Sequence, residues 1–350
     1  MEALSLRDIY NRPVNIFSDG FVEKLLAMPY NQRSVYFANI FKNLEVISVN
    51  QEHGIPRIGK SDYANPKGWV NIDNYPPSDD TLSFEDYMSL VPDFVDPYED
   101  NIIEHDGVLV VRDDMLPGNL GSKCRFAEAL MQQTKEKYIV YAMVREGQAL
   151  KVLASVAKKY NKIVIGVACL YKTIPTSHIE AMQHGAVMMY YQTGGMAGAR
   201  KRCRAFINDQ LQGQGVYIPA GVKHPFITAG FAKSVRRIYD QYKPDIIFSV
   251  ASTMTMNHGI QIGAPKECEV VAIQVAGNSS TKKWPGRAKC IIHDQPFSQP
   301  CPKEDLPPFN SIKSYDAKGW KYALEYKKAN PDKIVMFWNV AGKHELLEKL

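Results

Sequence analysis

The chain has 350 residues, of which 45% are hydrophobic and 23% charged, and its formal net charge is +5. These values are ordinary for a globular protein, and the length is enough for one large domain or two ordinary ones. No apolar run approaches the roughly 18 residues of a membrane span and no signal peptide is visible, so we expect no membrane association. The mild positive charge permits an anionic ligand without requiring nucleic acid.

The cysteines are widely spaced along the chain, at positions 124, 169, 203, 268, 290 and 301. They form neither a Cys-x-x-Cys pair nor a His/Cys cluster with metal-ligand spacing. This pattern predicts free thiols in a reducing cytoplasm and no metal site.

Residues 1–84 do not share the pattern of the rest of the chain. They combine short helical pieces with a run rich in Pro, Asn and Asp over 65–80, while Trp69 and several tyrosines argue against simple disorder. We expect an N-terminal extension that wraps the remaining chain or contributes to an oligomer contact.

From residue 108 onward the sequence predicts strands and helices in turn. The apolar run Val108–Val111 indicates a buried strand, a loop rich in Pro and Gly follows, and Lys123 begins an amphipathic helix. The helix dipole disfavours a cation there, so Lys123 suggests an anionic ligand or conversion of its amine to an imine; the alternative is a solvated residue of the helix. The alternation predicts an α/β protein with parallel sheets and helices on both faces. Further strands are expected over 138–142, 162–169, 186–191, 245–250, 269–275 and 333–338, and helices over 148–160, 177–184, 198–211, 227–242, 256–262 and 319–329.

The segment 112–125, RDDMLPGNLGSKCR, resembles the "KRDDL…GGNKxRKLE" segment of pyridoxal-phosphate (PLP) enzymes with the tryptophan-synthase-β fold, known as fold type II. The nearest branch is that of D-cysteine desulfhydrase and aminocyclopropane-carboxylate deaminase. Five segments in family-like order, over about 85–345, carry the resemblance, which covers roughly three quarters of the chain.

The resemblance implies two doubly wound parallel-sheet domains with a cofactor cleft between them. Residues 85–125 and 225–350 are expected to form the larger, cofactor-binding domain, and residues 126–224 the smaller α/β domain. The resemblance also implies that Lys123 holds PLP as a Schiff base and later serves as a general base.

The loop after the strand at 245–250 matches the family's Ser-Gly-Gly-Thr loop, whose backbone N–H groups hold the cofactor phosphate at a helix N-terminus. Here Ser252, Thr253 and Thr255 would take this role, with hydroxyls supplied by Ser252 and Thr255, although Thr253 and Met254 stand where the family has glycines. The alternative is an ordinary N-cap on a helix.

The sequence YDAK at 315–318 resembles the Tyr-Glu-Gly-Lys stretch of the deaminase branch. The resemblance implies that Tyr315 lies near the reacting carbon and that Asp316 contacts the pyridine nitrogen, where an acid makes the ring a stronger electron sink. The alternative is a turn with an exposed aspartate. Asn339 is a further expected cofactor contact, at a strand end where the family has His-Thr-Gly-Gly. Val340 replaces the threonine, so the hydroxyl contact of that threonine is lost and Asp316 would have to replace it.

Glu146, Gly147 and Gln148 lie where the family carries a Ser-Asn-Gln/His trio that grips the substrate carboxylate. Gln148 agrees with that pattern, whereas Glu146 would repel a carboxylate at close range. Glu146 is therefore either an acid favoured at a helix N-terminus or a group that binds an amine.

These features favour a PLP-dependent enzyme, a cytoplasmic homodimer that acts on an amino-acid-like amine by elimination, deamination or decarboxylation. The basic residues at 200–204, 236–237 and 282–283 suggest an alternative, a PLP-type enzyme that modifies an amino group carried on a nucleotide or DNA. The missing loop glycines suggest another, a family member without cofactor that acts as a binding protein.

Overall fold

The computed structural model describes residues 83–143, 147–169, 175–191, 195–275, 286–297 and 299–342. The predicted N-terminal extension therefore lies outside the described residues, except for residues 83 and 84. The chain divides into two compact units: Thr134–Ala220 belong to unit 1, whereas Tyr75–Gln133 and Gly221–His344 belong to unit 2. The finer domain boundaries expected from the sequence, at 126 and 225, stay a prediction.

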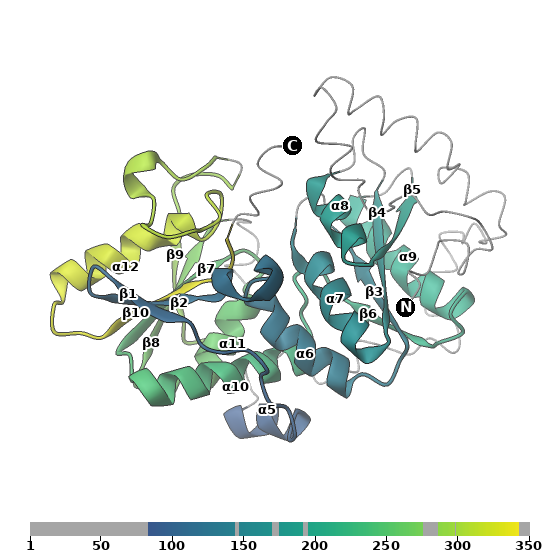
Figure 1. Ribbon diagram of the computed structural model, residues 1–350, viewed down its shortest axis with the longest axis horizontal. Coiled ribbons are helices and arrows are strands. Elements are labelled where there is room, and N and C mark those ends of the chain that lie inside the picture. The colour runs from purple at the N-terminus through teal and green to yellow at the C-terminus, as the bar shows by residue number, and fades with distance from the viewer. Residues whose placement is uncertain are drawn as a thin grey trace. The chain divides into compact units, whose positions relative to one another are not determined.

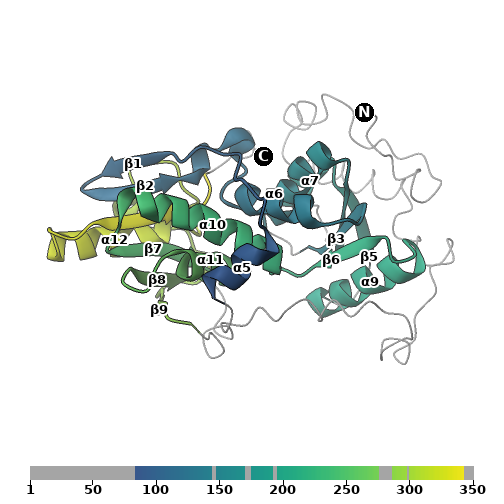
Figure 2. The same ribbon diagram turned by 90° about the horizontal axis from the view of Figure 1, so that it is seen from below.

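Unit 2 is built on a six-stranded sheet with the order β1-β2-β10-β7-β8-β9 (Figures 1 and 2). All neighbouring strands are parallel except β1 and β2, which form an antiparallel hairpin. The strand β10 comes last in the sequence, yet it lies between β2 and β7. The strands are β1 (Ile102–His105), β2 (Val108–Arg112), β7 (Ile246–Ala251), β8 (Glu269–Gln274), β9 (Lys289–Ile292) and β10 (Val335–Asn339).

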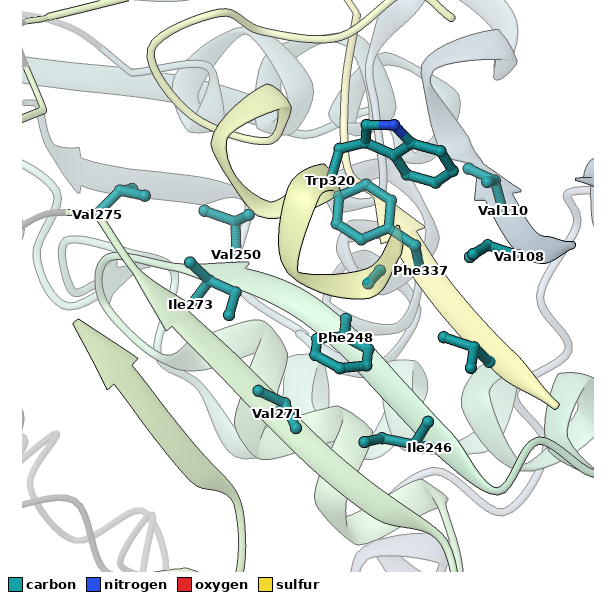
Figure 3. Packing of buried hydrophobic residues seen from close by; sticks show 12 residues of the cluster. Val108, Val110, Ile246, Phe248, Val250, Val271, Ile273, Val275, Trp320 and Phe337 are labelled. Atoms are coloured by element: carbon teal, nitrogen blue, oxygen red, sulfur yellow. The ribbon is translucent and has the colours of Figure 1, made fainter. Parts of the chain in front are cut away.

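Helices cover both faces of this sheet because its central strands are apolar on both sides. On one face, Trp320 of α12 (Ala317–Ala329) packs among inward side chains such as Phe248 and Phe337 (Figure 3). On the other face, Phe231 makes an edge-to-face contact with Trp338, with ring centroids 5.0 Å apart. The helices that cover this second face of the sheet are α6 (Lys123–Gln133), α10 (Pro225–Tyr242) and α11 (Thr255–Gly263). The short helix α5 (Phe84–Leu90) packs on α10.

Unit 1 has a four-stranded, fully parallel sheet with the order β5-β4-β3-β6. Cys203 and Phe206 of α9 (Gly195–Asp209) pack on one face of it. On the opposite face Gly166 leaves room for Leu150 of α7, since a Cβ there would collide with that side chain. The remaining elements are β3 (Tyr138–Ala142), β4 (Ile163–Cys169), β5 (Val187–Tyr191), β6 (Gly215–Ile218), α7 (Ala149–Ala157) and α8 (Thr176–Gln183).

The predicted alternation of strands and helices is confirmed, and with it the α/β class with parallel sheets. The sequence reading missed β1, β6 and β9. The missed hairpin has a strong turn signal, Asp106-Gly107, whose φ angles of 51° and 79° are those of a two-residue turn between twisted strands. The six cysteines are free thiols, and within the described ranges no helix combines the length and apolarity that crossing a membrane requires.

Candidate active site

Four of the segments singled out in the sequence lie in unit 2, at or just beyond the carboxyl edge of its sheet. Asn339 ends β10 beside Arg112, the last residue of β2. Lys123 begins the helix that follows β2, and residues 252–255 follow β7. Residues 315–316 directly precede α12. In open α/β sheets this edge is the usual place of ligand binding.

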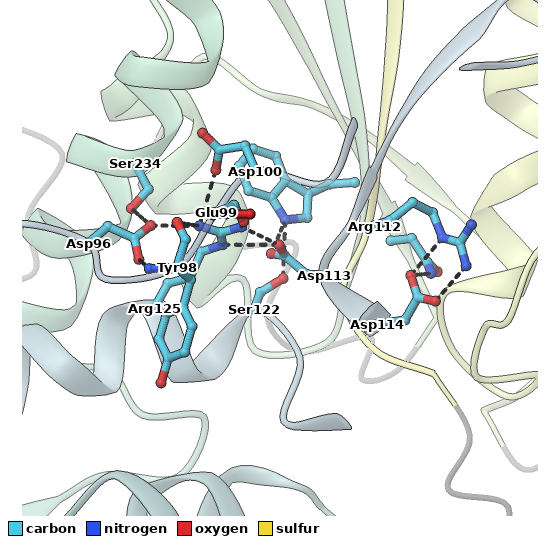
Figure 4. Close-up of polar contacts among 12 residues, drawn as sticks. Asp96, Tyr98, Glu99, Asp100, Arg112, Asp113, Asp114, Ser122, Arg125 and Ser234 are labelled. Carbon is cyan, nitrogen blue, oxygen red and sulfur yellow. Dashed lines mark hydrogen bonds and ion pairs between the residues drawn. The ribbon is translucent and has the colours of Figure 1, made fainter. Parts of the chain in front are cut away.

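Buried charges hold the loop that carries Lys123 (Figure 4). Asp113 at the end of β2 lies 2.9 Å from Arg125 of α6, and neither side chain has any solvent exposure. Arg125 also pairs with Asp96 at 2.7 Å and with Asp100 at 3.1 Å. The indole of Trp338 donates to Asp113 Oδ2 at 2.9 Å. These contacts fix the first turn of α6, which includes Lys123, to strands β2 and β10 of the sheet.

The same loop is fastened to the end of β10 through its backbone. The N–H of Ser122 donates to the carbonyl of Val340 at 2.8 Å. Gly121 has a φ of 71°, and a Cβ there would collide with that carbonyl. Only glycine meets both requirements, because other residues disfavour positive φ and need the space that Val340 fills.

Asn339 is fully buried, and its amide nitrogen is committed within the protein. It donates to Asp114 Oδ1 at 2.6 Å and to the carbonyl of Asn310 at 2.8 Å. Asp114 is held in turn by Arg112 at 2.7 Å. Among the described residues, Asn339 Oδ1 has no hydrogen-bond partner. Asn339 could therefore contact a cofactor only through Oδ1, as a hydrogen-bond acceptor. This contact stays a prediction.

Asp316 is fully buried, so the alternative of an exposed turn is wrong. Its Oδ2 accepts from the N–H of Ala341 at 3.3 Å, while Oδ1 has no hydrogen-bond partner in the described part of the chain. Burial raises the pKa of Asp316 to about 8, and the positive charge of Lys123 opposes this rise. At neutral pH the carboxyl therefore keeps its proton in the ligand-free protein, within electrostatic reach of Lys123.

Tyr315 lies against the end of β7. Its hydroxyl donates to the carbonyl of Val250 at 3.3 Å and also interacts with Ser252. Burial raises the pKa of Tyr315, so the phenol remains protonated at any physiological pH. The interaction brings Tyr315 to the loop at 252–255, whereas its expected place near the reacting carbon stays a prediction.

The loop between β7 and α11 keeps a backbone form that glycine normally supplies. Met254, which stands at a glycine position of the family, has a φ of 63° and is 2% exposed. Met254 is also the N-cap residue of α11, and its side chain makes no capping hydrogen bond, so the ordinary alternative of a side-chain N-cap is not met at this residue. The first N–H groups of a helix have no partner inside the helix, which makes them suitable for an anion.

The hydroxyls of this loop are engaged with the protein. Thr255 Oγ1 donates to the carbonyl of Gly221 at 2.8 Å. Thr253 Oγ1 lies 3.4 Å from Thr255 Oγ1. Backbone N–H groups, rather than these two hydroxyls, are therefore the donors that the loop offers to a ligand.

The predicted substrate-binding residues lie elsewhere in the chain. Glu146 is outside the described residues. Gly147 and Gln148 belong to unit 1, where Gln148 precedes α7 without a side-chain capping bond. Their role toward a substrate stays a prediction.

Sequence reasoning missed two features of this region, the network around Arg125 and the contact of Gly221 with the loop at 252–255. A signal for the first was present, because Asp113 and Asp114 directly follow a fully apolar strand and Arg125 follows two residues after Lys123. Charges so close to buried segments are usually paired. The second had no comparable signal, since Gly221 and Thr255 are far apart in the sequence.

No family model matches the sequence, and no curated protein matches it. Solved structures do match the fold. An ACC deaminase homologue aligns with a TM-score of 0.63 and 16% identity, over 75% of this chain and 99% of its own. Threonine deaminase isoform 2 from Solanum lycopersicum aligns with a TM-score of 0.58 and 12% identity, over 76% of this chain and 88% of its own.

Diaminopropionate ammonia lyase from Escherichia coli aligns with a TM-score of 0.55 and 10% identity, over 79% of this chain and 91% of its own. These structures are fold type II PLP enzymes, and the resemblance seen in the sequence is confirmed at the level of the fold. The TM-scores of 0.55–0.63 show the shared fold, whereas at identities of 10–16% the activity has to be argued from the site.

Proposed function

We propose that this chain is a PLP-dependent enzyme that acts on an amino-acid-like amine. The observation that carries the proposal is Asp316: a fully buried carboxyl with one oxygen that has no hydrogen-bond partner in the described residues. A buried polar atom without a partner costs free energy, so such an atom at the ligand edge of a sheet indicates a missing partner. A ring N–H or ring nitrogen would supply it.

The residues present fit PLP at three of its groups. Asp316 would face the pyridine nitrogen and share the proton that its raised pKa retains at neutral pH. Lys123 would carry the aldehyde end, since its charge is felt at Asp316 and its amine begins a helix held by buried ion pairs. The N–H groups at the start of α11, with Ser252 beside them, would hold the phosphate.

When bound, PLP supplies an electron sink for bonds at the α-carbon of an amine. Lys123 would then hold and return the proton at that carbon as a general base, for which a position fixed by Arg125 and Asp113 is required. Asp316 would keep the proton at the ring nitrogen. Gly147, Gln148 and Glu146 remain the proposed contacts of the substrate.

The reaction class is inferred from neighbours and from Asp316 together. Structures named as deaminases and an ammonia lyase share the fold. An acid at the ring nitrogen strengthens the electron sink, which suits removal of an α-proton. Elimination or deamination is therefore the chemistry that we propose, with decarboxylation as a further outcome if Glu146 binds the amine of the substrate.

The decisive experiment is to add PLP to the purified full-length protein, reduce it with borohydride, and locate the added mass by peptide mass spectrometry. We expect visible absorbance before the reduction and a modification on Lys123 after it. Lys123→Ala removes both, whereas the control Lys135→Ala, at an exposed position just after the end of α6, removes neither. A protein that stays colourless and unmodified is a binding protein of this fold without the cofactor, and the proposal then fails.

A further inference from the structure

The chain passes from unit 1 to unit 2 between Ala220 and Gly221. Two successive residues there have positive φ angles, 80° at Gly221 and 53° at Val222. For valine this conformation is a genuine outlier, because its branched side chain crowds the backbone. Val222 is nevertheless 1% exposed, so the surrounding unit holds the strained turn in place.

This turn contacts the loop at the start of α11 in two ways. The carbonyl of Gly221 accepts the hydrogen bond of Thr255 Oγ1 at 2.8 Å. In addition, a Cβ at Gly221 would collide with the side chain of Thr253. Both threonines thus contact the backbone of the crossing segment at Gly221, and only glycine at position 221 leaves room for the side chain of Thr253.

We propose that the Gly221–Val222 turn is a positioning element for the anion-binding loop at 252–255, and that anion binding is coupled to the conformation of the crossing segment. The inference rests on the proposed function, because the anion is the phosphate of PLP. A hydroxyl has a single proton, and Thr255 gives its proton to Gly221. Thr255 is therefore a brace of the loop, and the backbone N–H groups bind the anion.

Coupling follows from this arrangement by linkage. The strain at Met254 and the strain at Val222 lie at the two sides of one hydrogen bond, that between Thr255 and Gly221. An anion that favours the present form of the loop also favours the present form of the turn, and the effect is reciprocal. Without the hydrogen bond between Thr255 and Gly221, anion binding at the loop should no longer affect the conformation of the turn.

The test uses the full-length protein with two variants, Thr255→Val, which keeps the shape and removes the donor, and Thr255→Ser, which keeps the donor. Hydrogen exchange is measured by mass spectrometry for peptides over 218–224, without ligand, with PLP and with inorganic phosphate. In the wild type and in Thr255→Ser we expect ligand to slow exchange there on the order of tenfold. Thr255→Val is expected to bind about ten- to a hundredfold more weakly and, when saturated, to show no slowing over 218–224.

A saturated Thr255→Val protein that still shows wild-type slowing overturns the coupling, since Thr255 is then only a ligand contact. Unchanged affinity in Thr255→Val overturns it as well. One outcome is that PLP gives the protein no visible absorbance, whereas inorganic phosphate slows hydrogen exchange over 218–224 in the wild type but not in Thr255→Val. The coupling then stands and the proposed enzyme function fails. If neither ligand binds the wild type, both fail.

Discussion

Asp113 and Arg125 form an ion pair of 2.9 Å in which neither side chain has any exposure to solvent. Asp113 directly follows the apolar strand β2, and Arg125 lies in the first turn of α6, two residues after Lys123. The pair therefore sets where Lys123 stands relative to the strand ends of unit 2. Its neighbours Asp96 and Trp338 reach it from distant parts of the sequence.

Replacing Arg125 by methionine should lower the free energy of unfolding by about 3–5 kcal/mol, because Asp113 is left in the interior without its counter-charge and Asp96 keeps only the partly exposed Arg237. Urea unfolding measures the change. Arg237→Met is the matched control: that side chain also pairs with Asp96 but is 39% exposed, and its loss should cost less than about 1 kcal/mol. Equal losses in the two variants would contradict a special role for the buried pair.

Lys123→Ala should abolish turnover while leaving the fold intact. The side chain is only half-buried, so its removal takes little from the core. Circular dichroism and thermal unfolding should match the wild type, whereas product formation from amino-acid substrates should be lost. Full activity in this variant would exclude Lys123 as the residue that binds the cofactor.

Asp316 makes stability depend on pH in the ligand-free protein. Burial raises its pKa from 3.8 to about 8, so between these values the folded protein keeps a proton that the unfolded chain releases. Stability should therefore fall as pH rises from about 4 to 8, by at most about 1.4 kcal/mol per pH unit. Asp316→Asn should unfold like the wild type at pH 4 and be the more stable protein at pH 8. A parallel pH profile for the two proteins would show that Asp316 is ionised throughout.

The same residue should affect turnover more than binding. In the presence of PLP, Asp316→Asn should remain coloured and lose kcat on the order of tenfold to several thousandfold, with a smaller change in KM. Asp316→Glu should be milder, because it retains an acid. Near-normal kcat in Asp316→Asn would remove the argument for α-proton chemistry at this site.

The exposed cations of α9 test the alternative of a substrate carried on DNA. Arg200 and Lys201 are exposed, and the helix has no acidic residue before Asp209. If the substrate is carried on DNA, filter binding of duplex DNA over a salt series gives a plot of log affinity against log salt concentration. The slope of this plot should become shallower by about two in the double variant Arg200→Ala/Lys201→Ala. An enzyme for free amino acids should retain no DNA at any of these salt concentrations.

The sequence predicted the parts of this protein that local patterns determine. Apolar runs such as Val108–Val111 identify buried parallel strands, and Asp316 and Lys123 could be singled out by short motifs. The short edge strands β1 and β9 were missed because half-exposed edges need no continuous apolar run. The motif around Asp316 could not predict its pKa, because the burial that raises this pKa in the ligand-free protein depends on packing against distant segments of the chain.

The position of β10 has a consequence for the order in which the protein can fold during synthesis. β10 is the last described strand to be made, yet it pairs with both β2 and β7. Until residue 335 leaves the ribosome, those two strands lack their common neighbour, and pairing over such sequence separation is slow. A nascent chain that stops short of Val335 would present two unpaired strand edges, which are templates for aggregation.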